Sequence, residues 1–400
     1  MGLGRSFKVL WGANALSNLS DGIAFVTMPL LAASLTDDPR WVAGLATLYA
    51  VVRLVVVLPI GVYVDRLDRR VLLVAANVLR GIALIVLALS IQFGPVSLLM
   101  LYGTMAVVAT LESIADGSAV AVLPSLVPKK DLDTANSRIA AAQLIADEFM
   151  GPPLGGLLFA VAMALPAYAM GGLWVAAGVI ALALPKRTGL RQSYELERPR
   201  SVYAEALEGA QWLVRNRIVG SLGLIGGLSS IGYMLPFSVL VLFAEEQLGL
   251  GGTGYGILLA FSAIGGLVGS FITVSVRARF GYRLTITASL ALGAITLMIL
   301  AFISQPLVAG ALLALYIMHA VIWNICSTSI RQRLVPSELL GRVGAASRVL
   351  GLVGLALGSA FGGLLALTDI AAPTTAGAVI FGGCTLLALF TLRDIPQESE

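Results

Sequence analysis

Charge is scarce in this sequence. Only 12% of its 400 residues are Asp, Glu, Lys or Arg, whereas 58% are hydrophobic, and a soluble domain carries roughly 25% charged residues. The mean hydropathy is +0.93. This composition excludes an ordinary soluble domain and is typical of an integral membrane protein.

Cysteine and histidine are also scarce. The two cysteines, Cys326 and Cys384, lie inside apolar runs, and His319 is the one histidine. Two such cysteines provide neither a disulfide framework nor metal-ligand spacing. The sequence also lacks a phosphate-binding loop and any nucleophile–base pairing. We therefore predict a protein that is not an enzyme, holds no metal and uses no cofactor.

Twelve apolar segments are long enough, at about 20 residues, to cross a bilayer as helices. They cover residues 9–35, 41–64, 71–92, 96–118, 136–162, 164–185, 218–244, 253–276, 284–303, 306–330, 342–368 and 372–392. We predict an all-α integral membrane protein with an N-terminal six-helix bundle (1–185), a linker (186–217) and a C-terminal six-helix bundle (218–400). Apolar residues on one face of 201–216 predict an amphipathic helix at the membrane surface.

Basic residues are unevenly distributed among the turns. With a cytoplasmic N-terminus, 22 of the 26 Lys and Arg lie on the cytoplasmic side, three lie within segments, and Arg40 lies on the other side. The positive-inside rule then predicts that both termini are cytoplasmic. The pI of about 9.2 follows from this topology, so we expect no nucleic-acid partner.

The two halves of the chain also repeat. LPSLVPKKDLDTANS is followed by GPPLGGLL in the first half, and RQRLVPSELLGRVGA is followed by GSAFGGLLA in the second. The triplets Leu126–Pro128 and Leu334–Pro336 are 208 residues apart. Parallel six-helix repeats are typical of a transporter with its substrate site near the middle of the membrane, between the repeats.

Two motifs resemble those of the major facilitator superfamily. GVYVDRLDRRVLL, between the second and third segments, resembles the loop signature G-x-x-x-D-R-x-G-R-[RK], with Asp68 in place of the second glycine. EFMGPPLGG in the fifth segment looks like the antiporter motif of the family. The matching residues are Gly61, Asp65, Arg66, Arg69 and Arg70 in the first motif and Gly151, Pro152, Gly155 and Gly156 in the second.

This resemblance covers essentially the whole chain. WGANALSNLSDGIAFVTMPLL and the two LVP stretches are similar to the drug-exporter branch that includes macrolide and siderophore exporters. The resemblance implies the major facilitator fold and alternating access, with Asp65 and Arg69 latching the cytoplasmic side. An arginine-rich turn that only anchors the topology is the alternative.

The GPPLGG motif has a packing interpretation of its own. Asp147, Gly151 and Gly155 share one helix face, which allows a partner helix to approach closely. Gly265 and Gly269 in the eighth segment have the same spacing and are candidates for that partner. The family resemblance adds an export function, and ordinary small-residue packing is the alternative.

Charged residues within the segments are the candidates for the mechanism, because a charge that faces lipid costs several kcal/mol. A rise of 1.5 Å per residue places several of them at a similar depth. The candidate proton-coupling residues are Asp21, Glu112, Asp147 and Glu148. A static ion pair between Asp21 and Arg53 is the alternative for Asp21, and a pairing with Arg80 or Arg53 is the alternative for Glu148.

The candidate cavity and substrate residues are polar or aromatic. They are Asn14, Asn18, Phe25, Arg53, Asp116, Tyr233, Phe237, His319 and Trp323. Asn14, Asn18 and Phe25 share a helix face with Asp21. A helix cap or a loop-arginine partner remains an alternative for Asp116, hydrogen-bonded packing for His319, and lipid-facing positions for the aromatic residues.

The resemblance implies a secondary transporter in the bacterial cytoplasmic membrane. We expect a monomer that exports small hydrophobic or amphipathic compounds in exchange for protons, as multidrug efflux antiporters do. The fourth segment lacks the arginine that many drug–proton antiporters carry there. It has Glu112 and Asp116, which suit a cationic or zwitterionic compound. The alternatives are a lipid or lysolipid flippase of the same fold and a non-transporting membrane sensor or assembly protein.

Overall fold

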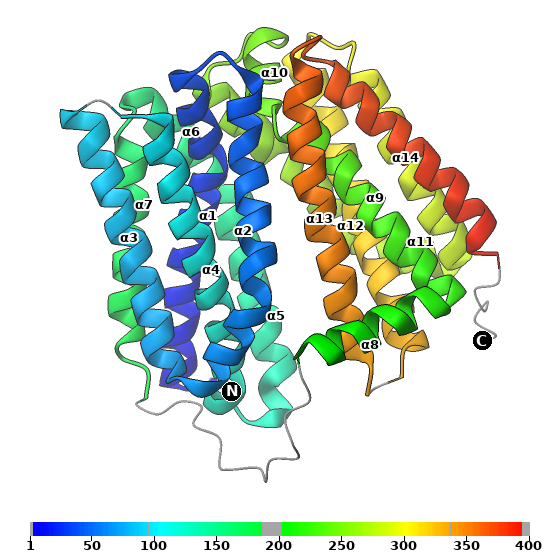
Figure 1. Ribbon diagram of the computed structural model, residues 1–400, viewed down its shortest axis with the longest axis horizontal. Helices are drawn as coiled ribbons and strands as arrows, with labels where there is room; N and C mark the ends of the chain where they lie inside the picture. The colour runs from blue at the N-terminus through cyan, green and yellow to red at the C-terminus, as the bar shows by residue number, and fades with distance from the viewer. Residues whose placement is uncertain (1–2, 95, 186–201, 337, 394–400) are drawn as a thin grey trace. The chain divides into compact units, whose positions relative to one another are not determined.

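The computed structural model describes residues 3–94, 96–185, 202–336 and 338–393, and all regular structure within these ranges is helical (Figure 1). The helices of the first half are α1 (Arg5–Leu35), α2 (Pro39–Arg66), α3 (Arg69–Phe93), α4 (Leu98–Leu126), η1 (Lys129–Asp131), α5 (Leu132–Gln143), η2 (Leu144–Met150), α6 (Gly151–Val161) and α7 (Leu165–Ala181). The remaining helices are α8 (Val202–Arg215), α9 (Arg217–Phe237), α10 (Leu240–Glu246), α11 (Gly252–Leu300), α12 (Pro306–Leu334), α13 (Leu340–Ala366) and α14 (Ala372–Thr391).

The all-α membrane fold predicted from the sequence is confirmed. Ten stretches of helix in the described residues are long and apolar enough to cross a membrane, with α5 to α6 and α9 to α10 each forming one stretch. At 49 residues, α11 is about twice the length that one span needs. It is broken at Gly281, where φ is 73° and ψ is 168°. When α11 is taken as two spans and the 17-residue α7 is added, the described helices supply the twelve predicted spans.

Contacts between Cα atoms divide the chain into two compact units. The first unit comprises Met1–Asp37, Val51–Glu197 and Gly251–Ala260. The second comprises Asp38–Ala50, Arg198–Leu250 and Phe261–Glu400. Helices α2 and α11 therefore contribute residues to both units. The bundle bounds at 185 and 218 stay a prediction from the sequence.

The first unit is built on α1 and α3, which both pack on α7. Helix α4 packs on α3, and η2 with α6 packs on α1. A core of buried apolar residues lies where α1 begins and α4 ends, and includes Phe7, Leu10, Leu73 and Leu123. These contacts position the polar residues of α1, α3 and α4 that form the site described below.

The second unit is organised around α9, which packs on α13 and α14. The amphipathic helix predicted over 201–216 is present as α8, and it lies on α13 and α9. Leu213 is buried against Val219, Val335 and Val343, whereas Val214 is exposed. Alternation of buried and exposed apolar residues explains how one short helix both packs on the unit and leaves an apolar surface outside it.

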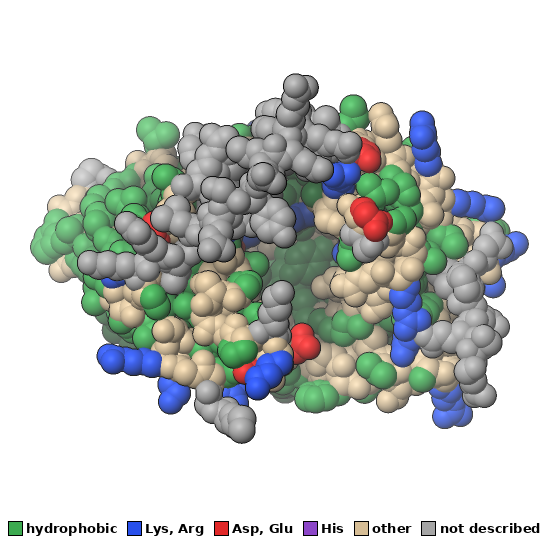
Figure 2. Space-filling model, turned by 90° about the horizontal axis from the view of Figure 1, so that it is seen from below, with side chains coloured by type: hydrophobic (Ala, Val, Ile, Leu, Met, Phe, Trp, Pro, Cys, Tyr) green, Lys and Arg blue, Asp and Glu red, His purple; other side chains and the backbone are tan. Residues whose placement is uncertain are grey.

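Basic side chains gather at one end of each unit. In the first unit this is the end at which α1 begins, and in the second it is the end at which α12 finishes with Arg331 and Arg333 in its last turn. Figure 2 shows these ends, with more Lys and Arg than Asp and Glu in view. The opposite end has Arg40, whose guanidinium binds Asp38 at 2.6 Å. The uneven distribution of Lys and Arg among the turns of the sequence therefore corresponds to a basic end and an opposite end of the helices in each unit.

Candidate transport site

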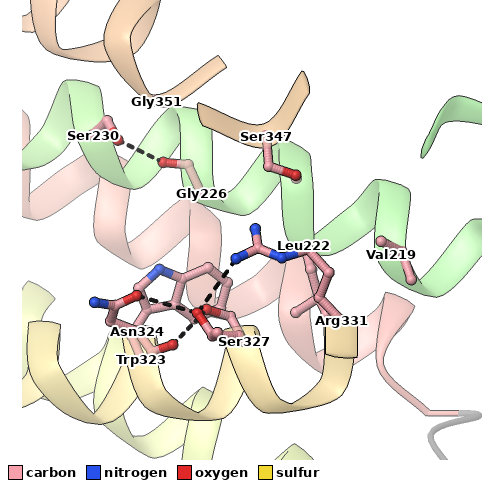
Figure 3. A pocket seen from close by; sticks show the side chains of 12 residues that line it. Val219, Leu222, Gly226, Ser230, Trp323, Asn324, Ser327, Arg331, Ser347 and Gly351 are labelled. Atoms are coloured by element: carbon pink, nitrogen blue, oxygen red, sulfur yellow. Dashed lines mark hydrogen bonds between the residues drawn. The ribbon is translucent and has the colours of Figure 1, made fainter. Parts of the chain in front are cut away.

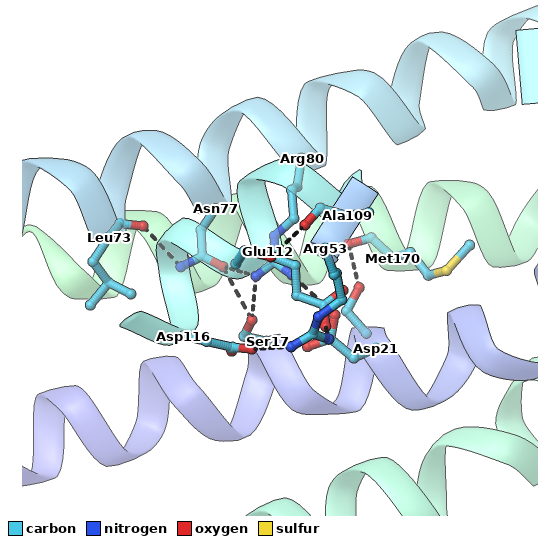
Figure 4. Close-up of polar contacts among 12 residues, drawn as sticks. Ser17, Asp21, Arg53, Leu73, Asn77, Arg80, Ala109, Glu112, Asp116 and Met170 are labelled. Atoms are coloured by element: carbon cyan, nitrogen blue, oxygen red, sulfur yellow. Dashed lines mark hydrogen bonds and ion pairs between the residues drawn. The ribbon is translucent and has the colours of Figure 1, made fainter. Parts of the chain in front are cut away.

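A buried arginine lies at the centre of the first unit. Arg80 of α3 is 1% exposed. Its Nη1 lies 3.1 Å from Oδ1 of Asp21 on α1, and its Nη2 donates to Oγ of Ser17 at 2.7 Å and to Oδ1 of Asn77 at 2.8 Å. The guanidinium also lies 4.6 Å from the ring centroid of Trp174 on α7. Figure 4 shows Arg80, Asp21, Ser17 and Asn77 converging between α1 and α3.

The geometry explains how a charge is tolerated in this position. A buried guanidinium is costly unless a carboxylate and further acceptors surround it. Asp21 supplies the opposite charge, Ser17 and Asn77 supply neutral acceptors, and the indole face of Trp174 adds a cation–π contact. The structure therefore differs from two alternatives considered from the sequence, because Asp21 is bound by Arg80 rather than Arg53, and Arg80 binds Asp21 rather than Glu148.

A second arginine binds the two acids of α4. Nη1 of Arg53 on α2 lies 2.8 Å from Oε1 of Glu112, and its Nη2 lies 3.4 Å from Oδ2 of Asp116. Helix α4 continues to Leu126, so Asp116 does not cap its end. The neighbouring helix α2 thus supplies the arginine that the α4 sequence lacks. Asp116 therefore has an intramembrane arginine, Arg53, as a partner.

The acids of the fifth span lie on a π-helix, η2. Asp147 is half-buried and Glu148 is exposed. Asp21 interacts electrostatically with Asp147, Glu112 and Asp116, so these four carboxylates share one region of the unit. No ion pair between Glu148 and an arginine occurs among the described residues, so its expected pairing is not seen. π-Helices are rare and are frequent at functional sites, and the sequence pattern did not predict this one.

The GPPLGG motif packs tightly against α1. A Cβ at Gly151 would lie 2.5 Å from backbone atoms of Gly22, and a Cβ at Gly22 would overlap the backbone of Asp147. A Cβ at Gly155 would lie 2.9 Å from the carbonyl oxygen of Ile23. These glycines therefore set the distance between α1, which carries Asp21, and η2, which carries two further acids.

The other face of the motif meets the first residues of α11. A Cβ at Gly156 would overlap the carbonyl of Gly252, and a Cβ at Gly256 would lie 2.5 Å from the carbonyl oxygen of Pro152. The eighth span is thus the partner, as expected from the sequence, but Gly252 and Gly256 make the contact and the expected Gly265 and Gly269 do not. Gly265 approaches Ala314 and Gly269 approaches Met318, both on α12.

The arginine-rich loop is described in part. The side chains of Gly61, Asp65 and Arg66 lie outside the described residues. Asp68 accepts a hydrogen bond from the backbone N–H of Arg70 at 2.9 Å and so caps α3, which is the local role of the residue that replaces the signature glycine. The latch itself stays a prediction.

Arg69 and Arg70 bind carbonyl groups near the ends of two helices. Arg69 donates to the carbonyl oxygen of Ala121 in α4 at 2.8 Å, and Arg70 donates to that of Leu182 at the end of α7. Cations near the C-terminal carbonyls of a helix interact favourably with its dipole. In this structure, both arginines tie the start of α3 to neighbouring helix ends.

The polar stripe expected on α1 is only partly continuous. Asn14 is half-buried, Asn18 is 8% exposed and Phe25 is 48% exposed. Nδ2 of Asn18 has no hydrogen-bond partner among the described residues. Asn18 and Asp21 therefore face the interior of the first unit, and Phe25 faces its outside.

The aromatic residues of the second unit form a cluster. The rings of Tyr233 and Phe237 stack with centroids 4.4 Å apart, and Tyr316 stacks on both at 6.0 and 5.9 Å. His319 lies 4.7 Å from Tyr316 and 4.9 Å from Phe381. His319 is 1% exposed, which agrees with a packing role. The sequence analysis missed Tyr316 and Phe381, although Tyr316 and His319 are three residues apart on α12 and so share a helix face.

Trp323 lies apart from this cluster, in a cavity of about 170 Å³ between α9, α12 and α13 (Figure 3). The cavity is lined by Val219, Leu222, Gly223, Gly226, Ser230, Trp323, Asn324, Ser327, Thr328, Arg331, Ser347 and Gly351. Of these, the sequence analysis named only Trp323 as a site residue. The polar residues on α12 could have been found from their three- and four-residue spacing.

Comparison with known proteins now identifies the family. The model of the transmembrane secretion effector family matches residues 4–399. The chain belongs to this family. Transmembrane secretion effectors are transporters of the major facilitator superfamily and not enzymes, so the resemblance inferred from the sequence motifs is confirmed.

Curated relatives extend along the whole chain. The enterobactin exporter EntS of Salmonella typhi is 26% identical over 402 residues, and that of Escherichia coli (strain UTI89 / UPEC) is 27% identical over 401. Each alignment covers 98% of this chain and 94% of the relative. This secretion effector is thus a multi-pass membrane transporter with siderophore exporters among its relatives.

Solved structures confirm the fold. A bacterial homologue of the iron transporter ferroportin, in an inward-facing state, matches with a TM-score of 0.77 at 17% identity, covering 97% of this chain and 99% of that one. A bacterial homologue of the human lysosomal transporter Spinster matches with a TM-score of 0.76 at 14% identity, covering 98% of each chain. At these identities the likeness concerns the fold alone.

Proposed function

We propose that this secretion effector exports small hydrophobic or amphipathic compounds by proton antiport and alternating access. The observation that carries the proposal is the pair of arginine–carboxylate contacts within membrane-spanning helices, Arg80 with Asp21 and Arg53 with Glu112. Intramembrane ion pairs are costly and mark ion or proton pathways in transporters.

A carboxylate bound by an arginine can couple to a proton. When a proton forms an O–H bond with the carboxylate, the negative charge is lost and the attraction to the guanidinium weakens. The helices that the pair joins are then held together less strongly, and a conformation in which they separate becomes more populated. Asp21 and Glu112 are the first candidates, and Asp147 and Glu148 on η2 are the next.

Orientation follows from the charged end of each unit. We propose that this end faces the cytoplasm, with both termini there, in the bacterial cytoplasmic membrane, since Lys and Arg are enriched on cytoplasmic sides. Asp65 and Arg69 are proposed to latch that side. We expect a monomer.

The substrate class is proposed from the relatives. Proteins named as enterobactin exporters align over nearly the whole chain, which supports export of a small amphipathic molecule. Glu112 and Asp116 both contact Arg53. Their charge is therefore partly neutralised and does not by itself select a cation.

The test is proton release from proteoliposomes with an acidic lumen, on addition of lipophilic cations, macrolides, enterobactin or lysolipids. The native protein is compared with Asp21→Asn and Glu112→Gln. Asp38→Asn is the matched control, because Asp38 is outside the spans and its pKa is lowered by hydrogen bonds from Arg40, so it stays ionised in the assay. We expect substrate-dependent proton release in the native protein and in Asp38→Asn, and its loss in at least one of the other variants.

Equal transport by all four proteins, with or without a proton gradient, would contradict the coupling. Movement of lysolipids alone would favour a flippase instead. Absence of any transport, with a cellular phenotype that survives the carboxylate substitutions, would favour a sensor or assembly protein.

A further inference from the structure

The cavity of the second unit has a charge pattern that the first unit does not share. Arg331 is the one charged residue among its lining residues. The helices that form the cavity, α9, α12 and α13, contain arginines but no Asp or Glu. Within the described residues, Arg331 makes no ion pair. It makes a long hydrogen bond, 3.4 Å from Nη2 to Oγ1 of Thr328.

Among the described residues, Arg331 is the main source of unengaged hydrogen-bond donors at the cavity. The hydroxyl groups of Ser230, Ser327 and Ser347 donate to backbone carbonyls of their own helices. The Arg331 guanidinium carries five N–H groups, most of them not engaged. In Figure 3 its side chain runs back along α12 toward Ser327 and Trp323, so the N–H groups lie within the cavity together with an indole ring.

The size of the cavity limits what can bind. Pockets that hold a whole drug-sized ligand measure roughly 300–1,000 Å³, and this cavity measures about 170 Å³. It is therefore large enough for one group of a substrate. A guanidinium in need of an acceptor favours an anionic oxygen, and the flat face of Trp323 favours a ring.

We propose that this cavity binds an anionic group carried on a flat ring, as one part of the transported compound. This inference rests on the proposed export function and adds a substrate class to it, namely amphipathic compounds with an aromatic carboxylate or phenolate. Arg331 binds the anionic oxygen, Trp323 contacts the ring, and Asn324 with Thr328 borders the anion. A phosphate group of an anionic lipid presents the same anionic oxygens.

The test uses the full-length protein in phosphatidylcholine nanodiscs and isothermal titration with benzoate and with benzamide, its uncharged analogue. We expect the native protein to bind benzoate at least tenfold more tightly than benzamide. Arg331→Gln should lower the benzoate affinity tenfold or more, since hydrogen bonds to charged groups are among the strong ones. Arg333→Gln is the matched control. It removes the same charge two residues away on α12, where Arg333 is exposed and is absent from the cavity lining.

Two further measurements keep the result unambiguous. The preference for benzoate over benzamide needs no variant, so it remains informative if Arg331→Gln is unstable. Repeating the titration with one phosphatidylglycerol in about three lipids separates the sources of the anion. If this lipid weakens benzoate binding to the native protein and to Arg333→Gln, but leaves the weaker binding to Arg331→Gln unchanged, a lipid headgroup occupies the cavity. If it leaves benzoate binding to the native protein unchanged, a soluble anion occupies the cavity.

Equal affinity for benzoate and benzamide, or benzoate binding that persists in Arg331→Gln, would overturn the inference. The proton-release assay distinguishes failure of this inference from failure of the antiport proposal. Whichever of Asp21→Asn and Glu112→Gln stops proton release should still bind benzoate, whereas Arg331→Gln should lose benzoate binding and still release protons with an uncharged amphiphile. Arg331-dependent binding without any proton movement would support the cavity and contradict antiport.

Discussion

Arg80 and Asp21 form an ion pair of 3.1 Å between two membrane-spanning helices, 59 residues apart in sequence. The arginine side chain is 1% exposed and the aspartate side chain is 19% exposed. The pair is therefore asymmetric. A proton can reach the carboxylate from a partly open side, while the guanidinium stays enclosed by Ser17, Asn77 and Trp174.

Substitution of either partner should destabilise the protein, and substitution of both should cost less than the sum. Removing one member of a buried pair costs about 3–5 kcal/mol because the other charge remains buried. We expect Arg80→Leu to lower the free energy of unfolding by about that amount and Asp21→Asn by less, since Asn can still accept a hydrogen bond from Arg80. Thermal unfolding of the two single variants and the double variant measures the coupling. Strict additivity would show that the contact contributes nothing.

Close packing of α1 on η2 should make Gly22 intolerant of a methyl group. A Cβ at Gly22 would overlap the backbone of Asp147, whereas a Cβ at Gly12 on the same helix has nothing within 4 Å. We expect Gly22→Ala to lower both the melting temperature and transport. Gly12→Ala should be neutral or stabilising by up to about 1 kcal/mol, because alanine is the better helix former. Similar melting temperatures for both variants would show that α1 and η2 are not in contact.

The contact of α8 with α13 should depend on packing more than on charge. Glu208 and Arg342 form a 2.8 Å ion pair, but their side chains are 46% and 26% exposed. An exposed pair contributes about 0–1 kcal/mol, so Glu208→Gln should barely change stability. A Cβ at the adjacent Gly209 would lie 2.5 Å from the backbone of Arg342. Gly209→Val should therefore displace α8, which faster proteolysis within α8 would report. If Glu208→Gln disturbed α8 more than Gly209→Val does, the ion pair would matter more than the packing.

Gly281 should be required for its backbone conformation. Its φ of 73° and ψ of 168° belong to a region that is almost exclusive to glycine, and a Cβ there would meet no atom within 4 Å. Strain alone should thus cost Gly281→Ala about 1–3 kcal/mol. Gly341→Ala is the control, because Gly341 has equal space and no positive φ. A melting temperature that falls in neither variant would show that the break in α11 does not depend on glycine.

The sequence predicted the helices far better than the contacts among them. Length and hydropathy define a span without reference to other helices, so the twelve spans followed directly. The amphipathic helix followed from the spacing of its apolar residues, and the family from the resemblance of two motifs. Pairing depends on which side of each helix faces which neighbour. Depth alone suggested Arg53 as a partner for Asp21, whereas the packing of α3 and α1 on α7 brings Arg80 to it. The cavity beside Arg331 was missed because its residues come from three helices that are distant in sequence.

The two spans of α11 are connected at Gly281 by a single non-helical residue, so no flexible loop separates them. Rotation about the backbone torsions of that glycine is the freedom available to tilt one of the two helices against the other. The eighth and ninth spans are thus directly coupled, and a displacement of either one is transmitted to the other through Gly281.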